Sequence, residues 1–354
     1  MISDTSNKGR IIVFDILKGI AIILVVINHV KWVRDLKFAP FFFRTTVAVA
    51  VPIFITITAY LYAKNADQIG IDNWYSRDHI KHMARRLLPA STVTIISSFI
   101  YDVGIRKTPF RALLRYTLLK GPFGPGGYYV FTLFQIIAVY PFFYHLAKSY
   151  PAISTAGIFL SNLLFELIPS EIVDPNWIYP IFFFRFSSLI FLGTILYFHY
   201  GMIKNSIIPI IGIIAYFYMQ FLTEIGYRFT IIVRWRHGSQ IFAGMLAFSV
   251  LFYSINKNDF FLKENCLNKV WGVFACIGKA SYQIYLFQVF FFGYISNFVY
   301  AFLSNFYPGN APMVLTNVID TFIMIIICTV VGFFWFSLEN LMNQLISRHL
   351  LRQS

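Results

Sequence analysis

The sequence predicts an all-α protein, a polytopic membrane bundle of about ten transmembrane helices. Of its 354 residues, 58% are hydrophobic and only 12% are charged. A soluble domain contains about 45–50% apolar and about 25% charged residues. The apolar residues come in runs of roughly 20, the length of helix that crosses a bilayer. This composition excludes a disordered chain, a disulfide-rich secreted scaffold and an ordinary cytosolic enzyme.

The expected spans are separated by Pro, Gly, Asn and charged clusters, as the turns between helices require. The first is a retained span and not a cleaved signal peptide, because Asp15 and Lys18 interrupt it and no small-residue cleavage site follows. We expect one integral-membrane domain over residues 1–354, with no separate soluble domain. The predicted spans are residues 11–30, 47–63, 87–104, 128–147, 153–169, 181–199, 206–223, 239–255, 279–303 and 314–338.

The chain is basic, with 29 Lys and Arg against 15 Asp and Glu and a formal net charge of +14. In a membrane protein such an excess usually flanks the helices and meets anionic headgroups, so we expect membrane lipids as partners and no nucleic acid. A basic surface for an anionic substrate stays open as a second interpretation. The distribution of Lys and Arg over the loops leans slightly toward a cytoplasmic N-terminus. We expect a multi-pass protein of the plasma or inner cell membrane.

Cysteine and histidine give no sign of a metal site. The three cysteines, Cys266, Cys276 and Cys328, are an odd number without CxxC spacing, and we interpret them as packing residues. The seven His form no cluster along the sequence. We therefore expect no metal ion and no disulfide.

The first span carries polar groups that lipid would exclude: Asp15, Lys18, Asn28 and His29. Each ionisable residue within a span costs roughly 2.5–3.5 kcal/mol on insertion scales. Lys18 and His29 share one helix face and lie roughly 16 Å apart along the axis. In one interpretation Asp15 pairs with Lys18 near the headgroups and His29 marks the helix end. In the other, His29 is a general base for a hydroxyl and Lys18 holds an anionic group.

Three further basic residues have both a structural and a functional interpretation. Arg85 and Arg86 end a basic loop that either anchors the helix on the inner face or grips a nucleotide phosphate. Arg185 lies among phenylalanines and is expected to face the bundle interior, where it binds substrate or pairs with Glu224 or Asp320. The glycine-rich stretch before Tyr128 lacks the GK[ST] ending of a phosphate loop, and we expect a sharp, tightly packed turn there.

Over nearly its whole length the sequence resembles the membrane-bound acyltransferase family 3. In that family an Arg or Lys, ten intervening residues and a His form the signature of the first helix, which Lys18 and His29 match. Two positions depart from the pattern: Met83 interrupts the basic motif, and Gln288 stands where a His is usual. The matching segments are Phe14–Ile22 with Asn28 and His29, the basic run ending Arg86-Leu87-Leu88-Pro89, Tyr128–Gln135 with Tyr140-Pro141, Arg185 before Phe191-Leu192-Gly193, Gly278–Leu286, and Phe336-Ser337-Leu338-Glu339.

The resemblance implies transfer of an acyl group, usually acetyl from acetyl-CoA, to a hydroxyl of a carbohydrate or lipid-linked glycan. No permanently bound cofactor is implied, because acetyl-CoA or another acyl-CoA is a co-substrate. His29 is then the catalytic base, assisted by Lys18. The CoA would be held by Arg85, Arg86 and Lys18, and the substrate or oxyanion candidates are Asn28, Tyr128 and Arg185.

Two other functions stay open. A transporter or flippase would be favoured by inverted repeats and paired broken helices, which the sequence does not show. Another enzyme of lipid-linked glycans would also have many spans and basic loops, but it gives no reason for the pairing of Lys18 with His29. The sequence indicates neither the acceptor, the acyl chain nor the oligomeric state.

Overall fold

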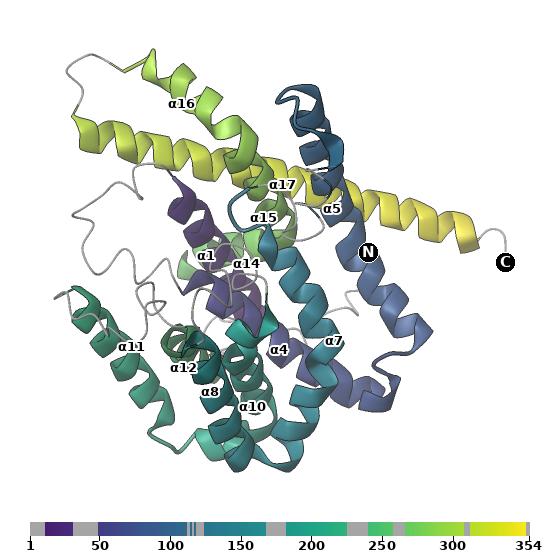
Figure 1. The fold of residues 1–354 in the computed structure, drawn as a ribbon, viewed down its shortest axis with the longest axis vertical. Coiled ribbons are helices and arrows are strands. Elements are labelled where there is room, and N and C mark those ends of the chain that lie inside the picture. Colours follow the sequence, from purple (N-terminus) through teal and green to yellow (C-terminus); the bar gives the residue numbers. More distant parts are fainter. Residues whose placement is uncertain are drawn as a thin grey trace.

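The computed structural model describes most of the chain as helices joined by turns, with no strand among the described residues (Figure 1). Membrane character is evident in six described helices that are long and apolar enough to cross a bilayer. The protein is therefore an all-α polytopic membrane protein, as predicted. The described residues are 11–30, 49–111, 114, 117, 124–167, 182–224, 240–257, 266–307 and 312–351.

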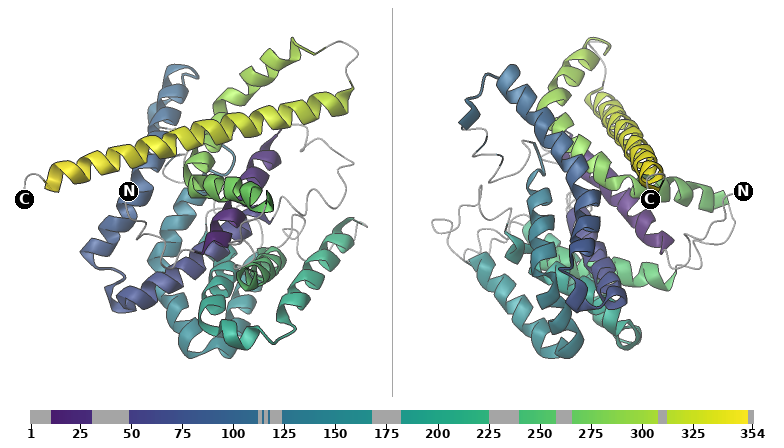
Figure 2. Two further views of the ribbon diagram at one scale, coloured as in Figure 1. Left: turned by 180° about the vertical axis from the view of Figure 1, so that it is seen from behind. Right: turned by 90° about the vertical axis from the view of Figure 1, so that its right-hand side faces the viewer.

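Every predicted span overlaps a helix or a run of consecutive helical segments, although the ends differ, and α17 continues well beyond its predicted end. The long C-terminal helix α17 lies across one side of the bundle (Figure 2). The helices are α1 (Ile12–His29), α4 (Ala50–Ile69), η2 (Ile71–Asn73), α5 (Arg77–Gly104), α7 (Tyr128–Ser149), α8 (Pro151–Leu167), η3 (Phe183–Phe186), α10 (Ser187–Ile203), α11 (Ile208–Glu224), α12 (Gln240–Asn256), α14 (Cys266–Lys279), α15 (Ser281–Phe290), the π-helical turn η5 (Phe291–Ile295), α16 (Ser296–Ser304) and α17 (Met313–Leu351).

The basic segment before Pro89 is helical, so its prediction as a loop was wrong. Helix α5 begins at Arg77, where the Ser76 hydroxyl accepts a hydrogen bond from the backbone N–H of His79 at 3.4 Å. It continues through Pro89, which has no N–H to donate to the carbonyl of Arg85 four residues earlier. Close to the proline, the Ser91 hydroxyl donates to the Leu87 carbonyl at 2.8 Å.

The segment between the eighth and ninth predicted spans contains a helix that the sequence did not predict, α14. Helix α14 packs against α1 without intervening side chains. A Cβ atom on Gly19 would lie 2.0 Å from the carbonyl oxygen of Phe274, and one on Gly278 would lie 1.8 Å from that of Asp15. Small residues allow such close approach of two helix backbones in membranes. The backbone contact therefore brings this short helix directly against α1.

Helix α1 occupies the centre of the bundle and also packs against α4, α15 and α17. Its buried residues include Ala21 and Ile22, both fully enclosed. Helices α4 and α10 approach almost as closely as α1 and α14, since a Cβ on Gly193 would lie 2.3 Å from the Thr56 carbonyl oxygen. The core therefore surrounds the helix that carries the predicted base.

Candidate functional site

Three neighbouring segments, α1, α5 and α15 with η5, run in the same direction. At one end the Tyr282 hydroxyl donates to the Leu87 carbonyl at 3.2 Å, and at the other the Tyr101 hydroxyl donates to the Tyr294 carbonyl at 3.4 Å. Helix α1 follows the same course, with its first turns against α14, which directly precedes α15, and its last residue beside η5. The early residues of all three segments therefore lie toward one end of the site.

The structure places Lys18 and His29 on α1, and both side chains are half-buried. His29 is the last residue of the helix, and the centre of its ring lies 6.0 Å from that of Phe292 in η5. The imidazole therefore packs against a neighbouring segment of the bundle. Asn28, another predicted site residue, is exposed.

Arg85 and Arg86 both have exposed side chains on α5. The charge of Arg86 lies close enough to interact with the hydroxyls of Tyr62 in α4 and Tyr282 in α15. A carboxylate lies nearby, because Glu339 in α17 accepts a 2.8 Å hydrogen bond from the side-chain amide of Gln283. This end of the site therefore combines a cation with tyrosine hydroxyls and an acid.

The glycine-rich segment before α7 packs along α15. Gly124 has a φ of +146°, and a Cβ there would lie 2.1 Å from the Val289 carbonyl oxygen. The Tyr285 hydroxyl donates to the carbonyl of Gly126, and the fully buried amide of Gln288 donates to that of Pro125 at 3.2 Å. The expected tight turn is confirmed, and the side chains of Tyr285 and Gln288 in α15 hold it in place.

Tyr128 and Arg185, both predicted site residues, contact the same buried ring. Tyr128 stacks on Phe186 with an interplanar angle of 5°, and the Arg185 guanidinium carbon lies 5.3 Å from the Phe186 ring centre. Of the acids predicted as partners of Arg185, Asp320 accepts a hydrogen bond from the Tyr307 hydroxyl. The side chain of Glu224, the other predicted acid, lies outside the described residues.

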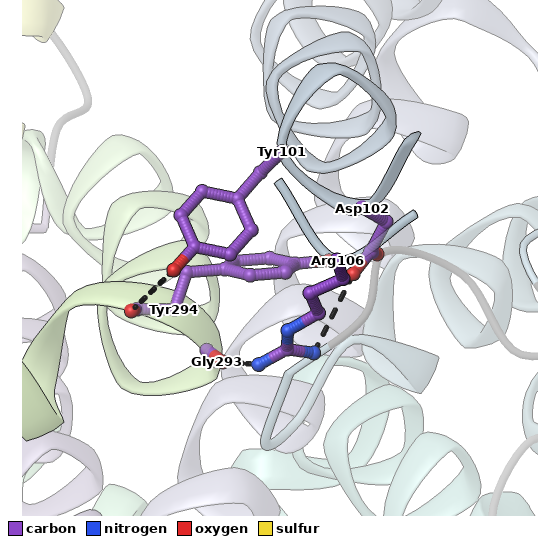
Figure 3. A network of polar contacts seen from close by, with 5 residues as sticks. All are labelled: Tyr101, Asp102, Arg106, Gly293 and Tyr294. Carbon is purple, nitrogen blue, oxygen red and sulfur yellow. Dashed lines mark hydrogen bonds and ion pairs between the residues drawn. The ribbon is translucent and has the colours of Figure 1, made fainter. Parts of the chain in front are cut away.

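A polar cluster at the opposite end of α5 was not predicted (Figure 3). Arg106 lies 3.4 Å from the Asp102 carboxylate and donates to the Gly293 carbonyl at 3.0 Å. The Tyr294 hydroxyl donates to the other Asp102 oxygen at 2.5 Å. The only sequence signal was an Asp and an Arg four residues apart at the end of a predicted span, which does not indicate a partner on another helix.

Two further features lie away from these residues. An apolar groove of about 620 Å³ between α7, α8 and η3 is lined by Phe142, Ile153 and Phe184 among others. Beyond the predicted end of the second span, the Asp67 carboxylate accepts a hydrogen bond from Lys148 at 3.3 Å. Burial alone raises the pKa of Asp67, but hydrogen bonds from Lys148 and two tyrosines and the Lys148 charge outweigh it and lower that pKa.

Comparison with known proteins identifies one family over most of the chain. The model of the Acyl_transf_3 family, described as an acyltransferase domain, matches residues 11–338. Neither the curated proteins nor the solved structures include a match to this sequence. The matched region contains α1, α5, α15 and η5, the elements around the candidate site. The chain therefore belongs to acyltransferase family 3, and it is a multi-pass membrane acyltransferase.

Proposed function

We propose that the protein moves an acyl group, acetyl in the simplest case, from acyl-CoA to a hydroxyl of a carbohydrate or lipid-linked glycan. The observation that carries this proposal is that α1 packs along α15 and η5, and that α15 in turn packs against α5. Lys18 lies toward the end where the charge of Arg86 acts on Tyr62 and Tyr282, and His29 lies at the other end beside η5. A cation and an imidazole roughly 16 Å apart suit a long, thin donor with an anionic head.

His29 acts as the general base in this reaction. Its imidazole takes the proton of the acceptor hydroxyl as the hydroxyl oxygen attacks the thioester carbonyl. The carbonyl oxygen becomes negative, the carbon–sulfur bond breaks, and the proton passes from His29 to the departing thiolate. The products are an ester and free CoA. Such base catalysis contributes typically 10²–10⁴-fold to the rate.

Arg85, Arg86 and Lys18 hold the donor. Guanidinium groups bind phosphates through charge-assisted hydrogen bonds, and the exposed side chains of Arg85 and Arg86 suit contact with the CoA head. Because CoA is a cytoplasmic polyanion, the proposal requires the N-terminal end of α1 to lie on the cytoplasmic side of a cell membrane. The CoA head would remain in water while the arm follows α1 toward His29.

Tyr128 and Arg185 are better candidates than Asn28 for contact with the acceptor or the oxyanion. Both pack on Phe186, Tyr128 from the start of α7 and Arg185 from η3, and each offers a donor. Asn28 is exposed, so its amide is less suited to a site from which water is excluded.

The test is transfer of label from acetyl-CoA to an alkali-labile ester in membranes that contain the protein. We expect His29→Ala to abolish transfer, while His145→Ala, a change at an exposed histidine of α7, leaves it intact. Full activity of His29→Ala with normal accumulation would remove His29 as the base. Transfer from no acyl-CoA tested would refute the donor assignment.

The donor site has its own test. We expect Arg86→Ala to raise the KM for acetyl-CoA more than that for the acceptor, because only the donor carries phosphates. Arg77→Ala, at the exposed start of the same helix, is the matched control for loss of positive charge. Equal donor KM values in the two variants would assign Arg86 to topology alone.

A further inference from the structure

The π-helical turn η5 separates α15 from α16 and contacts two parts of the site. A π-helical turn is rare in proteins and occurs frequently at functional sites. On one side, Phe292 of this turn packs its ring against His29 at 6.0 Å. On the other, Gly293 and Tyr294 bond to the end of α5 (Figure 3). One short turn therefore connects the proposed base to the polar cluster on α5.

Asp102, Arg106 and Tyr294 form a closed set of contacts, here called the η5 clamp. Arg106 donates to a backbone carbonyl within the turn and its guanidinium carbon lies 4.8 Å from the Tyr294 ring centre. The Asp102 carboxylate accepts a hydrogen bond from the Tyr294 hydroxyl and forms an ion pair with the Arg106 guanidinium. Asp102 and Tyr294 are 3% and 4% exposed, so water competes little for these bonds. The clamp therefore holds η5 both through the backbone carbonyl of Gly293 and through the side chain of Tyr294.

We propose that the η5 clamp positions His29 for catalysis by fixing the turn that carries Phe292. This inference rests on the proposed role of His29 as the base. The clamp residues are positioning residues, because they act on the imidazole through Phe292. A misplacement of about 1 Å in a catalytic geometry can cost about 10²-fold in rate.

The clamp also relates the two ends of the site. Helix α5 carries Arg86 in its first half and Asp102 near its end, and it is continuous between them. The clamp joins the end of α5 to η5, and η5 packs on His29. The distance between Arg86 of the donor site and the base is therefore set by two helices, α5 and α1. The clamp thus keeps the thioester of the bound donor at the right distance from the His29 imidazole.

The experiment compares two conservative changes with a matched control. Tyr294→Phe removes only the hydroxyl that bonds to Asp102, and Phe292→Leu removes the ring that packs on His29. Tyr253→Phe, at an exposed tyrosine of α12, is the control for loss of a hydroxyl. We expect kcat to fall about tenfold or more in the first two variants with the donor KM little changed. The acid limb of the pH profile of kcat/KM, which reports the free-enzyme base, should shift in both.

A second readout does not depend on activity. Carbethoxylation of His29 by diethyl pyrocarbonate, followed by mass spectrometry of its peptide, measures how well the ring is covered. We expect His29 to react several-fold faster in Tyr294→Phe and at the original rate in Tyr253→Phe. An unchanged rate together with an unchanged kcat in Tyr294→Phe would overturn the positioning role. If His29→Ala kept full activity, the base assignment would fall, while the modification rates would still decide whether the clamp positions the ring.

Discussion

Replacement of Gly278 by alanine tests the contact on which the position of α1 depends. The added Cβ would lie 1.8 Å from the carbonyl oxygen of Asp15, whereas ordinary contact begins at 3.4 Å. The obstacle is backbone on a central helix, so no flexible side chain can move aside. The two helices must therefore separate by about 1.6 Å, the difference between those two distances. Overpacking of this kind typically costs about 1–3 kcal/mol, and occasionally more.

Gly272 provides the matched control, because it lies on the same helix and a Cβ there meets nothing within 4 Å. Gly272→Ala should raise the free energy of unfolding by about 0.5–1 kcal/mol, as alanine favours a helix over glycine. Gly278→Ala should lower that free energy despite the same gain in helix propensity. Activity should fall as well, because Asp15 lies one turn from Lys18.

The assay is reversible denaturation of both variants in one lipid–detergent mixture, followed by tryptophan fluorescence. Opposite shifts of the two midpoints relative to the unmodified protein are expected. Equal midpoints for Gly278→Ala and Gly272→Ala would refute the backbone contact between α1 and α14.

Two further predictions concern stability. Because the pKa of Asp67 is lowered on folding, its contribution is fully present above the unfolded value of about 3.9 and is lost as pH falls through the lower folded value. Asp67→Asn should therefore lose less stability than the unmodified protein between pH 5 and pH 2, by about 0.5 kcal/mol since the pair with Lys148 is partly exposed; equal losses in both proteins would contradict this. Gln288→Leu leaves the carbonyl of Pro125 without its donor and should cost about 1–3 kcal/mol in denaturation experiments, whereas Gln68→Leu at an exposed position should cost little.

The spans could be predicted from the sequence because each has a run of apolar residues long enough for lipid. The same reasoning missed α14, whose docking depends on the absence of side chains at Gly19 and Gly278. Hydropathy cannot detect a contact between two backbones. It also placed the start of the apolar part of α5 correctly near Arg86, but it took the charged turns before that residue for a loop, although helices extend beyond the membrane when their ends are capped.

The predicted site residues were those whose charge or polarity is unusual within a span. Lys18, His29 and Arg185 stand out in this way, and so they could be selected without a structure. The bond between Asp102 and Tyr294 joins residues 192 positions apart, and nothing near either residue indicates the other. Gln288 was noticed only as a departure from the family pattern, whereas its hydrogen bond to Pro125 depends on the packing of α15.

The place of α15 in the chain has a consequence for biosynthesis. This helix bonds to α5 through Tyr282, to the glycine-rich segment through Tyr285 and to α17 through Gln283. Chains are synthesised and folded from the N-terminus, so the earlier helices enter the membrane before their shared neighbour exists. The contacts of α5 and of the glycine-rich segment with α15 therefore form only after this late helix has been inserted. A chain truncated before Ser281 would thus contain every residue proposed to contact substrate and still lack the piece that assembles them.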